Sequence, residues 1–293
     1  MSNTQNGILG DVPNNAIYLY FSLKPDANPQ DALKDIAELC DGENHVVGLG
    51  EPLLLAMGKS VPGLKSCPSI AMPGNNIPST QQALWVWLRG KDQGELLHES
   101  RRIMKMLEDD FIVTANINAF MYRDSRDLTG YIDGTENPTG EEAVQAAIVS
   151  GVQEGLDGSS FVAVQQWVHD LDHFQQMTPQ EQDNCFGRRA SDNEEFNDAP
   201  DYAHVKRTAQ ESFDPQAFVV RRSMPWSDSQ QAGLVFVAFG HSFAAFEALL
   251  NRMAGKEDGI TDGLFKFTHP VSGDYFWCPP MKQGKLDLSL VGI

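Results

Sequence analysis

The stretch QQALWVWLRG at residues 81–90 has a counterpart in QAGLVFVAFG at residues 231–240. Each contains a short apolar run that suits a buried strand, and each is followed by a helical pattern. In the first helix Leu96, Ile103 and Leu107 fall on one face. The two stretches match weakly residue by residue but clearly in pattern. They therefore predict two structurally similar α+β halves.

The other segments continue this alternation of strands and helices. Apolar alternation predicts strands at residues 15–23, 111–122 and 160–167. Residues 285–293 are predicted to form a final strand, and residues 61–79, interrupted by prolines, a surface loop. Because Pro138 breaks regular structure, we expect one half at residues 1–138 and the other at residues 139–293.

Composition and charge narrow the class of protein. The chain has 293 residues, 41% of them hydrophobic, which suffices for a large core. Its formal net charge of −18 would repel nucleic acids and anionic membranes, so we expect neither as a partner. No apolar run is long enough to span a bilayer, and we expect no secretory signal in the polar N-terminus. The four cysteines are far apart and form no CxxC pair, which predicts core thiols of a cytoplasmic protein.

The string GYIDGTENP at residues 130–138 is the first candidate for chemistry. Glycines flank Asp133, so the backbone can approach a flat ligand closely. A carboxylate held there can act as a general acid or base. The alternative is a structural turn, because Asp-Gly is a common turn dipeptide.

Two further segments carry reactive side chains. In HVKRT at residues 204–208, His204 is either a metal ligand or an ordinary surface histidine. The strand-like FVVRRSMPW at residues 218–226 delivers Arg221 and Ser223 to its end. The alternative for this segment is a strand edge held by salt bridges.

Taken in order, these three segments resemble the dye-decolorizing peroxidase family, in particular its bacterial B-type members. GYIDGTENP is the most specific match, supported by the His-x-x-Arg segment, RRSMPW and GITDGLFKF at residues 259–267. The resemblance covers essentially the whole chain. It implies an α+β fold of two ferredoxin-like halves, related to the dimeric α+β barrels, in which each half is an antiparallel sheet with helices on one face. This agrees with the internal repeat.

The resemblance also implies roles for individual residues. Haem b, which is iron protoporphyrin IX, would lie in the C-terminal half, with His204 as the iron ligand and Asp262 accepting from the other ring nitrogen. The catalytic residues on the peroxide side would be Asp133, Arg221 and Ser223, with Arg222 as the alternative to Arg221. The other expected cofactor contacts are Ile132, Gly134, Thr135, Phe236 and Arg207, the last pairing with a haem propionate.

We therefore expect a haem b peroxidase that uses hydrogen peroxide to oxidise phenolic, dye-like or other one-electron donors. At its ordinary pKa Asp133 is ionised at neutral pH, so it can act as a base, and we expect activity at acidic pH. Bulky donors would react at the surface through an aromatic relay. The candidate relay residues are Trp167, Trp226, Trp277 and Tyr131. By analogy, we expect a homo-oligomer, a dimer or larger.

Two alternatives remain open at this point. The same His204 would serve a haem-binding or iron-handling protein, such as a carrier or a deferrochelatase-like protein. In a different class, His169 and His173 have the spacing of metal ligands on one helix face, with Asp172 or Cys185 nearby as a further zinc ligand.

Overall fold

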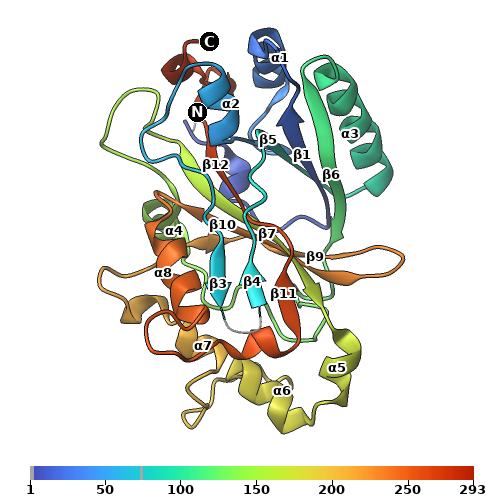
Figure 1. Cartoon of the computed structure of the whole chain (residues 1–293), viewed down its shortest axis with the longest axis vertical. Coiled ribbons are helices and arrows are strands. Elements are labelled where there is room, and N and C mark those ends of the chain that lie inside the picture. The colour runs from blue at the N-terminus through green and yellow to red at the C-terminus, as the bar shows by residue number, and fades with distance from the viewer. Residues whose placement is uncertain (1–2, 73–74) are drawn as a thin grey trace.

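Strands from both halves of the chain build one sheet in the computed structural model, which describes residues 3–72 and 75–293 (Figure 1). The strands of this sheet are β1 (Asn15–Leu23), β2 (His45–Leu49), β5 (Leu84–Gly90), β6 (Phe111–Phe120), β7 (Ser160–His169), β8 (Val220–Arg221), β9 (Met224–Ser227), β10 (Ala232–Gly240), β11 (Thr268–Pro270) and β12 (Asp274–Cys278). Two hairpins lie outside it, namely β3 (Ile70–Met72) with β4 (Asn75–Ile77) and β13 (Met281–Lys282) with β14 (Lys285–Leu286).

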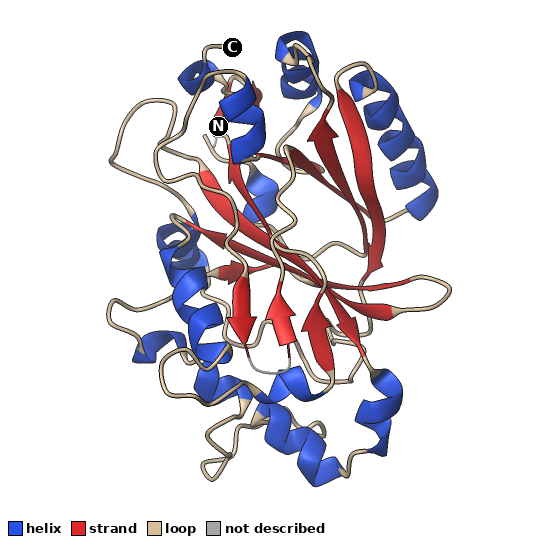
Figure 2. Cartoon of the chain, viewed as in Figure 1, coloured by secondary structure: helices blue, strands red, loops and turns tan. Residues whose placement is uncertain are grey.

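Helices pack on the outside of the strands (Figure 2). The α-helices are α1 (Gln30–Leu39), α2 (Glu51–Ala56), α3 (Gln93–Leu107), α4 (Gly140–Ala147), α5 (Leu171–Gln176), α6 (Pro179–Phe186), α7 (His204–Arg207) and α8 (Ala244–Met253). Short 3₁₀ helices are η1 (Asn6–Ile8), η2 (Gln210–Ser212), η3 (Gly263–Lys266) and η4 (Ser289–Val291). Helices α5, α6 and α7 gather at the end of the molecule opposite α1, α2 and α3 (Figure 1).

Both halves use the same strand order, as the internal repeat predicted. The first half pairs its strands in the order β6-β1-β5-β2, and the second in the order β12-β7-β10-β9. In chain order each half is strand, helix, two strands, helix and strand, which is the ferredoxin-like pattern. The halves join where β2 pairs with β12 and β6 with β9, so the sheet closes into an antiparallel barrel. The expected fold class is confirmed, while the boundary at residue 138 stays a prediction.

The barrel explains why some strands read as continuous apolar runs. On β5, Trp85 and Trp87 point into the barrel, where their rings lie 6.2 and 6.1 Å from that of Tyr18. Leu84 and Val86 point the other way, into the core beneath the outer helices. A strand that is buried on both faces has no polar face to show in its sequence.

The structure corrects three sequence-based expectations. Helices α2, α4, α6 and α7 were not predicted. The supposed loop at residues 61–79 contains the β3–β4 hairpin, although residues 73–74 lie outside the described part. The predicted strand at residues 285–293 ends at Leu286, and the chain then turns into η4, whose first residue, Ser289, donates its amide to the Asp287 carboxylate.

Two expectations about composition can be compared with the structure. Cys40, Cys67, Cys185 and Cys278 are buried free thiols, as predicted. Across residues 3–72 and 75–293, none of the helices combines the length and the apolar character needed to cross a membrane.

Candidate active site

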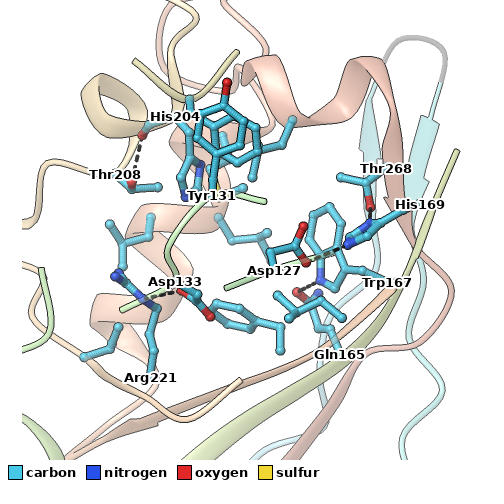
Figure 3. Close-up of a pocket in the computed structure, with 18 of the residues that line it drawn as sticks. Asp127, Tyr131, Asp133, Gln165, Trp167, His169, His204, Thr208, Arg221 and Thr268 are labelled. Carbon is cyan, nitrogen blue, oxygen red and sulfur yellow. Dashed lines mark hydrogen bonds and ion pairs between the residues drawn. The ribbon is translucent and has the colours of Figure 1, made fainter. Parts of the chain in front are cut away.

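A cavity of about 980 Å³, its open mouth included, lies in the C-terminal half between β7, β10 and α8 (Figure 3). Most of its wall is apolar, because β10 contributes Leu234 and Phe236 and α8 contributes Phe246, Leu250 and Met253. The predicted contact Phe236 thus lies on the cavity wall. A large apolar cavity with few polar groups is typical of a cofactor or ligand site.

Strand β7 adds a polar edge to this wall. Gln165, Trp167 and His169 alternate along β7 and line the cavity, while Val164 and Val168 belong to the barrel core. The side-chain amide of Gln165 accepts from Trp167 Nε1 at 3.2 Å. Its Nε2 is buried without a hydrogen-bond partner in the described chain, which leaves one donor available at the wall.

His204 enters the cavity from the first residue of α7 (Figure 3). Its Nδ1 lies 2.8 Å from Oδ2 of Asp262, a carboxylate that is almost completely buried. Because a carboxylate accepts, Nδ1 carries the proton and the lone pair resides on Nε2. The described residues offer no hydrogen bond to Nε2. The predicted pairing of His204 with Asp262 is therefore present, and it leaves a nitrogen ready to bind a metal.

The Asp262 carboxylate is held by its own turn. Its Oδ1 accepts from the amide of Leu264 at 2.8 Å, which starts η3. The next residue, Gly263, donates to the carbonyl of Tyr202 at 2.7 Å, and a Cβ there would lie 2.9 Å from Cys185 Cα. A glycine is required for this close approach between the turn and the end of α6.

Asp133 and Arg221 face His204 across the cavity (Figure 3). Arg221 Nε lies 3.8 Å from Asp133 Oδ1. The Asp133 side chain is 28% exposed, and this surface faces the cavity. Burial raises the pKa of Asp133 above its usual range, the Arg221 charge opposes the rise, and the Asp127 charge adds to it. The sequence analysis expected an ordinary pKa for Asp133, whereas its surroundings in the structure raise that pKa.

Sequence reasoning missed a second hydrogen-bonded pair on the same wall. Asp127 Oδ1 lies 2.9 Å from Nε2 of His169, whose Nδ1 lies 2.7 Å from Thr268 Oγ1. The other Asp127 oxygen accepts from the amide and hydroxyl of Thr129 at 2.9 and 2.6 Å. These bonds, led by that to His169, hold the pKa of Asp127 below its usual range despite its burial. The alternation along β7 was the available signal, since it places His169 on the face of Gln165.

The zinc alternative is wrong. His169 is the last residue of strand β7 and does not share a helix face with His173, which lies exposed on α5. Both ring nitrogens of His169 already have partners. In the part of the chain that the structure covers, no group of three or more His, Cys, Asp or Glu side chains could hold a metal ion.

The remaining predicted contacts lie around the cavity. Ile132 lines it directly, and Gly134 and Thr135 line an adjoining pocket that also reaches His204. Ser223 lies in a neighbouring cavity that Asp133 and Arg221 share, and its Oγ accepts from the amide of Val237 at 3.3 Å.

The structure places the candidate arginines in different surroundings. Arg207 does not line the cavity. Its buried guanidinium pairs with both oxygens of Asp258 at 2.8 and 2.9 Å. Arg207 therefore has a carboxylate partner within the protein, in place of the haem propionate that the sequence analysis expected. Arg222 donates to the carbonyl of Leu9 at 2.9 Å, whereas Arg221 faces Asp133. Of these two arginines, Arg221 therefore lines the cavity, and its role at the peroxide stays a prediction.

Comparisons with known proteins identify the family of the chain. The family model described as "Dyp-type peroxidase, C-terminal" matches residues 124–283. The dye-decolorizing peroxidase of Mycobacterium tuberculosis is 28% identical over 291 residues, covering 93% of this chain and 87% of its own. A putative Dyp-type peroxidase from Shewanella oneidensis superposes with a TM-score of 0.89 at 27% identity, covering 99% of this chain and 98% of its own.

A third protein shares the fold. A variant of DypB from Rhodococcus jostii, solved in complex with heme, superposes with a TM-score of 0.86 at 23% identity, covering 93% of this chain and 94% of its own. Because the family model matches more than half of the chain, the chain belongs to the Dyp-type peroxidases. It is thus an oxidoreductase of a family that uses peroxide.

Proposed function

We propose that this chain binds haem b through His204 and uses hydrogen peroxide to oxidise phenolic, dye-like or other one-electron donors. One observation carries the proposal. An imidazole with a free Nε2 faces a carboxylate and a guanidinium across a single apolar cavity. A pure carrier would need the imidazole but not the pair opposite it.

The residues fit a haem better than a bare ion. His204 offers a single nitrogen, and the described chain supplies no cluster of further ligands, so the other ligands must arrive with the metal. The apolar wall suits a flat porphyrin, and the unpartnered Gln165 Nε2 suits a polar group at its edge. The heme complex of the structurally similar DypB supports the same choice. We infer the b type because the sequence contains no C-x-x-C-H attachment motif.

The bound haem would supply an iron that takes up peroxide and stores oxidising equivalents. His204 would hold the iron through Nε2, and its bond to Asp262 would make the imidazole a stronger donor. Asp133 in its ionised form would take a proton from one peroxide oxygen and return it to the other, which leaves as water. Arg221 would stabilise the negative charge that develops while the O–O bond breaks.

The predicted relay residues differ in their surroundings. Trp277 and Trp226 lie in the core, whereas Trp167 and Tyr131 line the cavity. The Tyr131 hydroxyl also donates to the carboxylate of Asp183 on α6. A phenol that loses an electron must release its proton, and Asp183 is placed to accept it. We therefore propose Tyr131 as the relay for donors too bulky to enter the cavity.

The test is rapid mixing of the haem-loaded protein with one equivalent of hydrogen peroxide, followed by absorption. A peroxidase should change its spectrum quickly. Asp133→Asn should slow this change by about 10²- to 10⁴-fold, the usual contribution of a general acid–base residue. A loaded wild-type protein that leaves peroxide unreacted would favour the carrier or deferrochelatase-like alternative.

Location and assembly are also proposals. The four buried free thiols fit a reducing compartment, so we propose the cytoplasm. Assembly as a homo-oligomer remains a prediction by analogy with relatives.

A further inference from the structure

The side chain of Asn137 joins the loop of Asp133 to the strand of Arg221. Its Nδ2 donates to the Arg221 carbonyl at 3.0 Å, and its Oδ1 accepts from the Arg221 amide at 2.8 Å. Both backbone groups of one residue are thus held by one side chain. Asn137 ends the same GYIDGTEN string that carries Asp133.

Gln210 makes a second bridge between the same two segments. Its Nε2 donates to the carbonyl of Glu136 at 2.9 Å, and its Oε1 accepts from the amide of Val219 at 3.0 Å. The Gln210 side chain is almost completely buried. It begins η2, in the segment that follows His204, so it ties the iron-ligand side of the cavity to the other two segments.

Gly134 leaves room for the first bridge. It has a φ of +83°, and a Cβ there would lie 2.9 Å from Asn137 Nδ2. Its carbonyl accepts from the Asn137 amide at 3.1 Å, which closes the turn. The Asp-Gly pair of the string therefore has a second purpose besides the turn itself, because it allows Asn137 to reach Arg221.

The Arg221 guanidinium depends on this support. Among the described residues its side chain has a single ion-pair partner, Asp133, at the long distance of 3.8 Å. Such a contact does not fix the geometry of either group. The backbone that carries Arg221 is held by Asn137, by Gln210 through Val219, and by its short pairing with β10.

We propose that Asn137 and Gln210 are positioning residues, which set the placement of Arg221 and Asp133 relative to each other and to the segment of His204. Their amides suit this role because each one donates and accepts at the same time, whereas a carboxylate only accepts. The proposal deepens the peroxidase function above and rests on it for the role of Arg221.

The experiment compares near-isosteric variants in the haem-loaded full chain. Asn137→Asp removes the hydrogen-bond donor to the Arg221 carbonyl, and Gln210→Glu removes the donor to the Glu136 carbonyl. Gln5→Glu is the matched control, because buried Gln5 holds the amide and carbonyl of Val47 at 2.8 and 2.9 Å, and neither residue lines the cavity. Fluoride affinity, measured by absorption, is the main readout, since this anion binds ferric iron and reports nearby hydrogen-bond donors. The peroxide reaction rate and the melting temperature are measured beside it.

Asn137→Asp and Gln210→Glu should keep equimolar haem but weaken fluoride binding and slow the peroxide reaction by about 10- to 100-fold, the cost of a misplaced catalytic group. Gln5→Glu should lower the melting temperature and leave the fluoride affinity and the peroxide reaction rate unchanged. If Asn137→Asp does not fold, Asn137→Ser takes its place in the comparison. This substitution also removes the amide donor, and it adds no charge beside Arg221.

The proposal is overturned if Asn137→Asp and Gln210→Glu bind fluoride with the affinity of the wild type. It is also overturned if Gln5→Glu weakens fluoride binding equally, because the effect would then follow stability alone. A wild-type protein that binds fluoride but ignores peroxide would instead remove the proposed function, and the fluoride comparison would still decide the role of the two amides.

Discussion

Replacing Arg221 with glutamine should move the acid limb of the peroxide reaction to higher pH. Asp133 must be ionised to accept a proton, and the Arg221 charge lies 3.8 Å from its carboxylate. That charge lowers the pKa of Asp133 against the burial that raises it. Without it the pKa of Asp133 rises further, so the ionised form is lost at a higher pH as the solution is acidified.

The size of the shift follows from the separation of the charges. Two unit charges about 4 Å apart attract by about 4 kcal/mol at an effective dielectric constant of about 20, equal to about 3 pKa units. This is an upper limit, because the pair is partly exposed within an open cavity. Carboxylates beside an arginine shift by about 1 to 3 units, so we expect a rise of about 1 to 2 units.

The assay measures the rate constant for hydrogen peroxide by rapid mixing over a range of pH. The midpoint of the acid limb is compared, since the amplitude also falls when Arg221 is lost. Asp127→Asn is the matched variant, because it removes a negative charge that raises the pKa of Asp133 and should lower the midpoint. If both variants shift the midpoint in the same direction, or if Arg221→Gln leaves it in place, this electrostatic reasoning is refuted.

Three further predictions concern other parts of the molecule. Asp262→Asn gives Nδ1 of His204 a neutral acceptor, so the iron of bound haem should become easier to reduce. A potentiometric titration should find a more positive midpoint potential. An unchanged or more negative midpoint potential would contradict the role of the His204–Asp262 pair. Phe239→Ala removes a fully buried ring from the barrel interior and should lower the free energy of unfolding by about 3–5 kcal/mol in urea titrations, whereas a loss under about 1 kcal/mol would count against this packing. Tyr131→Phe keeps the ring but removes the phenol proton, so turnover of a bulky dye should fall while that of a small phenol persists, and equal losses would exclude the relay.

Strong local patterns in the sequence predicted most of the fold. Residues 15–23 form β1 with the predicted bounds, and the face of Leu96, Ile103 and Leu107 is the buried face of α3. Helix α2 was missed because its apolar residues follow almost directly on those of β2, so that the sequence shows no separate helical pattern there. The closure of the barrel was not readable from local patterns, since the pairing of β6 with β9 joins segments that share no sequence signal, and only the family resemblance implied a barrel.

The candidate site was predictable where a family pattern supported it. The bond between His204 and Asp262 spans 58 positions, and the resemblance, not the spacing, singled it out. Arg207 was misplaced because a sequence does not say which side of a four-residue helix faces a cavity. His169 entered the zinc alternative because its strand was expected to end at residue 167, which placed it on the following helix.

The role of His204 is the claim on which the rest depends, and titration with ferric haem tests it most directly. Absorption would be followed for the wild type, for His204→Ala and for His173→Ala, a control that removes an exposed histidine on α5. We predict that the wild type and His173→Ala saturate at equimolar haem with the same intense Soret band, and that His204→Ala loses both the band and the tight binding. If His204→Ala binds haem with an unchanged spectrum and affinity, another group holds the iron and the account is contradicted.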